Sequence, residues 1–143
     1  MDRLKIEYVR VEELKPYPDS PREMVRDYCK RSIQRFGFLV PLIVNKDNEV
    51  ISGNIRLKAA QELGLEELPC IRVDLDKDAE QAFRLVDNRV KQVSNWDWCQ
   101  LDKELRKLSK GIEEFGLVPD QFQNVNIDRL FQSDKRQFLN LTD

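Results

Sequence analysis

The spacing of apolar residues predicts strands and helices that alternate over the first two thirds of the chain. Runs rich in β-branched and other apolar residues predict strands at 6–11, 38–44, 49–52 and 69–74. Apolar residues that recur every three or four positions predict helices at 21–36, 54–63 and 79–93, and a further helix whose stripe is Leu101, Leu105 and Leu108. This alternation favours an α/β fold (mixed α+β), in which a small mixed sheet is flanked by helices and followed by a helical C-terminal appendage.

Residues at the ends of these segments support the predicted boundaries. A capping box at 20–23 starts the first helix, and Gly37 ends it. Asp76 or Asp78 is suited to cap the third helix. The nearly continuous apolar run at 38–44 suggests a strand buried on both faces, and Pro41 implies that this strand starts or has an edge near that point.

A polar break near residue 95 divides the chain into two parts. We expect one domain at 1–94 and a helical appendage at 95–143 whose last residues fray. Asn95 or Asp97 is suited to cap the first helix of the appendage. Trp96 is interpreted as the residue that anchors the appendage by packing, with base stacking as the alternative.

Composition then narrows the class of protein. The chain has 143 residues and a net charge of −2, which argues against a strong, non-specific DNA binder. It has no apolar run long enough to span a membrane and no signal peptide, so we expect no membrane partner and a cytoplasmic location. Three scattered cysteines indicate reduced thiols, with Cys29 and Cys70 as small core residues. Histidine and a CxxC motif are absent, which excludes the usual zinc sites. The acidic run at 74–80 lacks the glycine and glutamate of a calcium loop, so no resident metal site is predicted.

A glycine turn between the strand at 49–52 and the next helix carries the main candidate chemistry. Gly53 permits a sharp turn, and Asn54 is suited to cap the helix. Arg56 falls in the first helical turn, where the helix dipole disfavours a cation. Backbone N–H groups, a close glycine and a guanidinium suit a bound phosphate. The alternative is an ordinary solvated arginine.

Basic residues form a second candidate surface. Arg22 is another cation in a first helical turn, and it could face the same anion as Arg56. Cations off the apolar stripe of the first helix, among them Arg22 and Arg35, form a basic face. The residues predicted to bind nucleic acid are three cations of this helix and one lysine of the second: Arg26, Lys30, Arg31 and Lys58. The alternative is an ordinary solvated helix surface.

Polar residues interrupt the helix at 79–93, whose apolar residues otherwise lie on one side. Asp87, with Asn88 and Arg89, either contributes to the site or forms a kink or a surface patch. If the chain is an enzyme, its chemistry needs a carboxylate near the arginines, and the weak candidates are Glu7, Glu49 and Asp87.

Four segments, in this order and spacing, resemble the N-terminal domain of the ParB family, which has the ParB/sulfiredoxin fold. The resemblance covers about residues 4–108 and is greatest to the ParB-like domains found beside DNA methyltransferases and in phages or mobile elements. The segments are PYPDSPR (16–22), SIQRFGFLVPLIV (32–44), ISGNIRLKAAQELGLEELPCI (51–71) and LVDNRVKQVSNWD (85–97).

The resemblance implies that the glycine-arginine motif binds nucleotide phosphates, with CTP as the known ligand of the family. Gly53 and Arg56 match the ends of that motif, and Arg22 matches the "PR" loop beside it. Asn54 and Ile55 stand where the usual motif has glutamate and arginine. Sulfiredoxins carry their reactive cysteine at the position of Asn54, which argues against that activity.

The resemblance further implies a module of a DNA-associated protein, in partition, transcriptional regulation or DNA modification. A nucleoside triphosphate (CTP or ATP) with Mg²⁺ would be the cofactor. DNA, bound directly or through a partner protein or fused domain, and a second copy of the chain would be the partners. The alternatives are a nuclease or ATP-dependent phosphotransferase, and a protein-interaction module with a patch near residues 96–98. No helix-turn-helix is visible in the C-terminal third.

Overall fold

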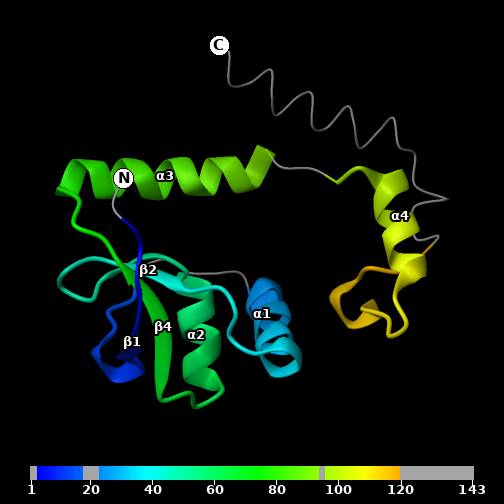
Figure 1. The fold of residues 1–143 in the computed structure, drawn as a ribbon, viewed down its shortest axis with the longest axis horizontal. Helices are drawn as coiled ribbons and strands as arrows, with labels where there is room; N and C mark the ends of the chain where they lie inside the picture. Colours follow the sequence, from blue (N-terminus) through cyan, green and yellow to red (C-terminus); the bar gives the residue numbers. More distant parts are fainter. Residues whose placement is uncertain (1–2, 18–22, 94–95, 120–143) are drawn as a thin grey trace, which may run out of the picture. The chain divides into compact units, whose positions relative to one another are not determined.

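Four strands form one mixed sheet in the computed structural model, which describes residues 3–17, 23–93 and 96–119, without the side chains of 23–25 and 92–93. The strand order is β1-β4-β2-β3. The inner strand β4 pairs antiparallel with β1 and parallel with β2 (Figure 1). The other inner strand, β2, also pairs antiparallel with β3. The bounds are β1 Ile6–Arg10, β2 Leu42–Val44, β3 Val50–Ser52 and β4 Glu67–Arg72.

The helices that the apolar spacing predicts are all present among the described residues. The bounds are α1 Glu23–Phe36, α2 Asn54–Glu62, α3 Lys77–Val93 and α4 Trp98–Lys107, with short 3₁₀ turns η1 Val11–Glu13 and η2 Glu113–Phe115. The start of the capping box lies outside the described residues. Asp76 caps α3 by accepting a hydrogen bond from the Ala79 N–H, at 2.8 Å. The predicted mixed α/β fold is confirmed.

The chain divides into two compact units, Met1–Asp87 and Asn88–Asp143. In the first unit, α2 packs its apolar side on the sheet, and α1 packs against α2 (Figure 1). The core contains side chains from both layers that water does not reach: Leu42, Val44, Val50, Leu57, Leu68 and Cys70. This packing fixes the place where β3 turns into α2.

Two expectations about burial are wrong. The strand expected at 38–44 begins at Leu42, because Pro41 cannot donate a ladder hydrogen bond, and the preceding Leu39 and Val40 are exposed rather than buried. Trp96 is 54% exposed, so it does not anchor the appendage by burial. The apolar side of α3 is also exposed, at Phe83, Val86 and Val90.

In the second unit, the expected cap and apolar residues of α4 are present. Asp97 caps α4, since its carboxylate accepts a hydrogen bond from the Gln100 N–H at 3.1 Å. Leu101 and Leu105 are the buried residues of this helix. Across the described part of the chain, every helix is too short or too polar to cross a lipid bilayer.

Candidate functional site

The turn between β3 and α2 is built around Gly53. Its φ of +107° lies in a region that residues with a side chain rarely adopt, and it is the N-cap residue of α2. A Cβ at this position would lie 2.4 Å from Leu42 Cδ2 and 2.8 Å from Arg56 Nη2. Glycine is therefore required here both by the backbone conformation and by the close approach of two side chains.

Arg56 lies over this turn. Its Nη2 donates a hydrogen bond to the carbonyl oxygen of Pro41 at 2.9 Å, which ties α2 to the start of β2. Its Nε is buried and has no hydrogen-bond partner among the described residues. Burial lowers the pKa of Arg56, and the Cys29 thiol and the Asp87 carboxylate oppose that change. The guanidinium remains a cation, because arginine does not lose its proton in proteins.

The side chain of Asn54 does not act as the expected cap. Gly53 is the N-cap residue instead, and Asn54 is the first residue of α2. Both polar atoms of the Asn54 amide are buried, and neither finds a hydrogen-bond partner in the described residues. Buried amides in native proteins are nearly always paired. The turn therefore presents a buried donor and a buried acceptor that the described side chains and backbone do not satisfy.

Asp87 reaches the same turn from α3. The Ser52 hydroxyl, in the last residue of β3, donates a hydrogen bond to Asp87 Oδ2 at 3.1 Å. Asp87 is also near enough to Arg56 to raise its pKa. The polar interruption of α3 thus brings a carboxylate to the site, as the functional interpretation of this stretch requires.

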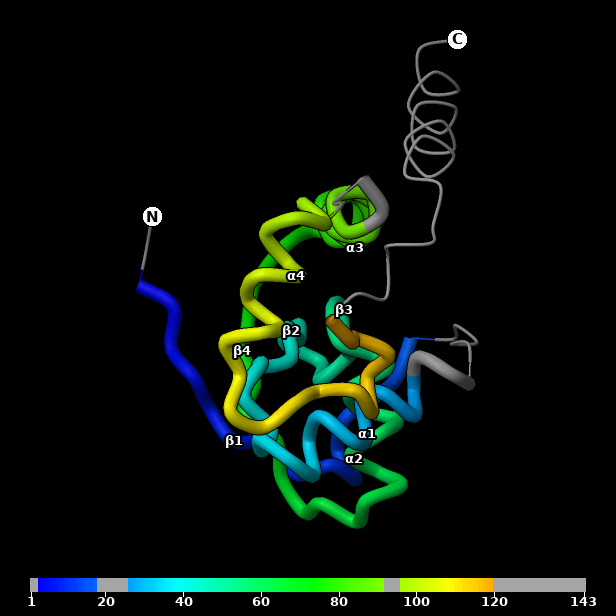
Figure 2. Tube along the Cα trace, turned by 90° about the vertical axis from the view of Figure 1, so that its right-hand side faces the viewer, coloured from blue at the N-terminus to red at the C-terminus, as the bar shows by residue number. Residues whose placement is uncertain are grey.

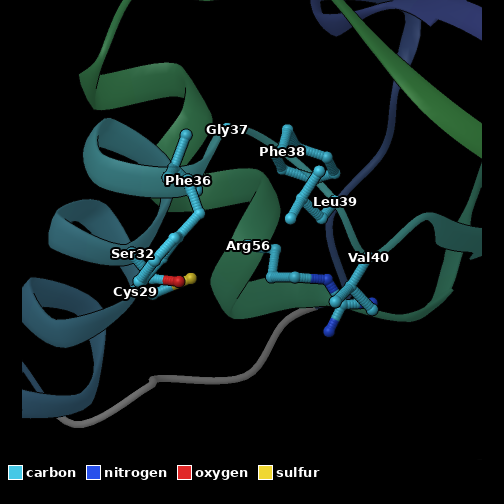
Figure 3. Close-up of a pocket in the computed structure, with 9 residues that line it drawn as sticks. Cys29, Ser32, Phe36, Gly37, Phe38, Leu39, Val40 and Arg56 are labelled. Atoms are coloured by element: carbon cyan, nitrogen blue, oxygen red, sulfur yellow. The ribbon is translucent and has the colours of Figure 1, made fainter. Parts of the chain in front are cut away.

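A cavity of about 180 Å³ opens beside Arg56. Its walls come from α1, from the loop that follows α1, and from α2, and Figure 3 shows Cys29, Ser32 and Arg56 lining it from two helices. Cys29 is half-buried and lies in this wall rather than in the sheet core, where it was expected. The burial of its thiol raises its pKa, and the nearby Arg56 limits that rise.

The structure does not unite all the predicted phosphate-binding and nucleic-acid-binding residues. Arg22 lies outside the described residues. Arg26 and Lys30 both form ion pairs with Glu62 of α2, each at 3.2 Å, so they link α1 to α2 and part of the predicted basic face is neutralised. Arg31 is exposed and Lys58 half-exposed on these two helices.

Of the three candidate carboxylates, the structure brings only Asp87 to the Gly53 turn. Glu7 is on β1, at the opposite edge of the sheet from β3, and accepts a hydrogen bond from Arg72 Nε at 2.7 Å. Glu49 precedes β3, at the end of that strand away from Gly53, where its N–H donates to Asn45 Oδ1. In the part of the chain that the structure describes, no group of three or more His, Cys, Asp or Glu residues could hold a metal ion.

Comparison with known proteins shows which family the domain that carries this turn belongs to. The family model for the ParB N-terminal domain matches residues 1–89. The chain belongs to the ParB N-terminal domain family. The resemblance stated from the sequence is therefore confirmed.

Three relatives and one solved structure illustrate the similarity. The ParB-like nuclease domain-containing protein YnaK of Escherichia coli is 34% identical over 74 residues, which are 49% of this chain and 84% of YnaK. The probable chromosome-partitioning protein ParB of Campylobacter jejuni is 29% identical over 94 residues, 61% of this chain. This chain covers 34% of that protein and 32% of a Bacillus subtilis relative, so it spans about a third of their length.

The solved structure is the C-terminally truncated chromosome-partitioning protein ParB from Caulobacter crescentus, complexed with CTP-gamma-S. It superposes with a TM-score of 0.60 at 23% identity, over 71% of this chain and 59% of that one. At this level of identity the likeness establishes a ParB N-terminal fold.

Sequence reasoning missed three members of the site. The Ser52 hydroxyl bonds to Asp87, and the Pro41 carbonyl oxygen accepts a hydrogen bond from Arg56. Cys29 lines the cavity beside Arg56. Residues of these types are common throughout proteins, and they reach the turn from distant parts of the sequence. The one available signal is that Ser52 immediately precedes Gly53.

Proposed function

We propose that this ParB N-terminal domain binds the phosphate groups of a nucleotide at the turn between β3 and α2. The observation that carries the proposal is the Arg56 guanidinium, which lies over Gly53 at the N-terminus of a helix with its Nε unpaired. The first N–H groups of a helix have no partner within the helix, and they attract anions. Phosphate oxygens would accept from these N–H groups and from Arg56 together.

The Asn54 amide supports the same proposal. A buried amide without partners costs about 1 to 3 kcal/mol for each unsatisfied group. A bound nucleotide would remove this cost, because phosphate oxygens accept from the amide nitrogen while a hydroxyl or a metal-bound water donates to the amide oxygen. Mg²⁺ is commonly held by one carboxylate together with substrate phosphates, and Asp87 lies where it could supply that carboxylate.

The comparisons support a nucleoside triphosphate as the ligand and a DNA-associated protein as the context. The Caulobacter structure is a ParB protein complexed with CTP-gamma-S, and the Campylobacter relative is a probable chromosome-partitioning protein. We therefore propose CTP as the first nucleotide to test and ATP as the second. Binding of DNA, directly or through a fused domain or partner, belongs to the same proposal.

Isothermal titration of the purified chain with CTP, ATP, GTP and UTP, with and without Mg²⁺, tests this proposal. We expect Arg56→Ala to weaken binding by roughly 10-fold to 100-fold, because a hydrogen bond to a charged group contributes about 1.5 to 3 kcal/mol. Arg10→Ala is the matched control, since Arg10 is exposed and pairs with Glu12 in another part of the fold. Circular dichroism checks that both variants fold.

Two results would contradict the proposal. One is that no triphosphate binds at low salt, and the other is that Arg56→Ala binds as tightly as Arg10→Ala. Retention on duplex DNA at increasing salt, measured on the same variants, separates a nucleotide site from a nucleic-acid phosphate site. If Arg56→Ala weakens only DNA retention, the bound phosphate belongs to DNA.

A second candidate function is an enzyme of phosphate chemistry, and the position of Asp87 favours it. A carboxylate near a cationic phosphate site can orient a nucleophile or hold Mg²⁺. The name of YnaK also includes a ParB-like nuclease domain. The distinguishing observation is Mg²⁺-dependent turnover of a nucleotide or of DNA.

A further inference from the structure

Two charged side chains of α3 are more deeply buried than apolar residues of the same helix. The side chains of Arg84 and Glu80 are 16% and 14% exposed, whereas Phe83 and Val86 are 36% and 60% exposed. Glu80, Arg84 and Asp87 are spaced as i, i+4 and i+7, so they lie on one side of the helix, which Figure 2 shows nearly end-on. Because an unpaired charge is costly to bury, this side of α3 depends on particular partners.

Arg84 is the middle residue of this charged side, and its guanidinium lies over the Tyr17 ring. Its Cζ is 3.6 Å from the ring centroid, within the range of a cation–π contact. Its Nη2 is 3.8 Å from Glu80 Oε1, which is too long for a hydrogen bond. Its Nε is buried and has no hydrogen-bond partner among the described residues. In the part of the chain that the structure describes, the Tyr17 ring is therefore the main contact that fixes this guanidinium.

The segment that carries Tyr17 is itself fixed to the sheet. The Lys15 N–H donates a hydrogen bond to the carbonyl oxygen of Asn48, and the Val50 N–H donates one to the carbonyl oxygen of Lys15, each at 2.9 Å. Val50 is the first residue of β3, the strand that leads into the candidate site. The contact with Tyr17 therefore ties α3 to the strand from which the site begins.

Contacts on either side of Arg84 hold α3 near the ends of two strands. Asn45, which follows β2, donates from its Nδ2 to both carboxylate oxygens of Glu80, at 3.3 Å each. Ser52, at the end of β3, donates to Asp87 at 3.1 Å. Arg84 and Asp87 are roughly 4.5 Å apart along the helix axis. Since a helix moves as a unit, a displacement of α3 at Arg84 also displaces Asp87 from Ser52.

We propose that Arg84 is a positioning residue of the candidate site. By stacking on Tyr17, it sets the position of α3 in which Asp87 reaches the Gly53 turn. This inference rests on the proposed function, in which Asp87 supplies a carboxylate for Mg²⁺ beside the bound phosphates. Arg84 acts through the helix and not by contact with phosphate. A planar cation is needed at this position, because the attraction to the ring depends on both its charge and its shape.

Disulfide trapping between positions 52 and 87 tests this position of α3. We expect the double variant Ser52→Cys/Asp87→Cys to form an intramolecular disulfide, because the two native side chains are in hydrogen-bond contact. Cys29→Ser and Cys99→Ser in the same chain remove the thiol beside the site and the exposed thiol. Addition of Arg84→Gln should slow disulfide formation by about twofold to thirtyfold, the loss that corresponds to a cation–π contact shielded from water.

Substitutions of Tyr17 test the partner of Arg84 in the same trapping assay. Tyr17→Leu should slow disulfide formation as Arg84→Gln does, and the two together should be no slower than either alone, because both remove the same contact. Tyr17→Phe retains an aromatic ring, so its disulfide should form as fast as with tyrosine. Lys77→Gln is the matched control, since it removes a cation from an exposed position of the same helix and should leave the rate unchanged.

Titration with CTP separates this inference from the proposed function. If CTP does not bind the unmodified chain, the proposed function fails, whereas the trapping rates still decide the role of Arg84. If CTP binds, Arg84→Gln should change the affinity for Mg²⁺-free CTP by less than about threefold, because Arg84 does not contact the phosphates. A larger loss of affinity would overturn the positioning role. So would equal trapping rates in Arg84→Gln and Lys77→Gln, or a Tyr17→Phe variant that is as slow as Tyr17→Leu.

Discussion

Replacement of Gly53 by alanine is the sharpest test of how the turn is built. The added Cβ would lie 2.4 Å from Leu42 Cδ2 and 2.8 Å from Arg56 Nη2. The arginine end is flexible and can move, but Leu42 is fully buried in the core and has little room. The substitution therefore strains the backbone and the core, and it also displaces Arg56 from its position over the turn.

The size of the effect follows from these two terms. A left-handed conformation costs a residue with a side chain about 1 to 2 kcal/mol, and overpacking a core costs about 1 to 3 kcal/mol. Gly53→Ala should therefore lower the free energy of unfolding by about 2 to 5 kcal/mol. At about 3 to 4 °C for each kcal/mol in a chain of this size, that corresponds to a fall in Tm of roughly 6 to 20 °C.

Gly64→Ala provides the matched control, because Gly64 follows the same helix and has a φ of +73° with no atom within 4 Å of an added Cβ. Gly64→Ala should lower the free energy of unfolding only by the cost of the left-handed backbone conformation, about 1 to 2 kcal/mol. Urea unfolding monitored by circular dichroism measures both variants, and their difference isolates the cost of the close approach. If the two variants differ by less than about 0.5 kcal/mol, the packing argument is refuted.

Two further predictions concern a buried thiol and the site carboxylate. Burial, with a smaller effect of Glu7, raises the pKa of the Cys70 thiol to about 11. An unfolded chain loses this proton at lower pH, so the unfolding free energy should fall more steeply between about pH 8.5 and pH 11 than in Cys70→Ala. If the unfolding free energies of the unmodified chain and of Cys70→Ala fall equally steeply with pH, the prediction is contradicted. Asp87→Asn should change the affinity for the nucleotide by less than about threefold. It should lower any Mg²⁺-dependent turnover, measured by phosphate release, by at least about 100-fold. Turnover that survives the substitution would exclude Asp87 as the catalytic group.

Local patterns were sufficient to predict the order of the elements and several of their boundaries. Helix caps such as Asp76 and Asp97 act within a few residues of their own position, so spacing reveals them. Gly53 was identified in the same way, because a glycine between a strand and a helix indicates an unusual φ. These interactions depend on neighbours in the chain, which a sequence displays directly.

Burial at long range was not predictable from the same patterns. The apolar residues of α3 and the run before Leu42 indicated packing or regular structure, yet Phe83, Val86 and Leu39 are exposed. Apolar periodicity shows that a face can be buried, but it does not show whether another element covers it. The basic side chains of α1 predicted either a nucleic-acid-binding face or a solvated surface, and Glu62 of α2 pairs with two of them.

The sequence by itself determined the family, the alternation of strands and helices, and the glycine-arginine turn, because each depends on residue order and short spacing. The tertiary structure decided what surrounds that turn. It brings Asp87 to Ser52 across 35 positions of the chain, ties Arg56 to Pro41, and leaves the Asn54 amide without a partner among the described residues. Such contacts arise only when the sheet and helices pack, since the chain distance between two residues does not fix their distance in space.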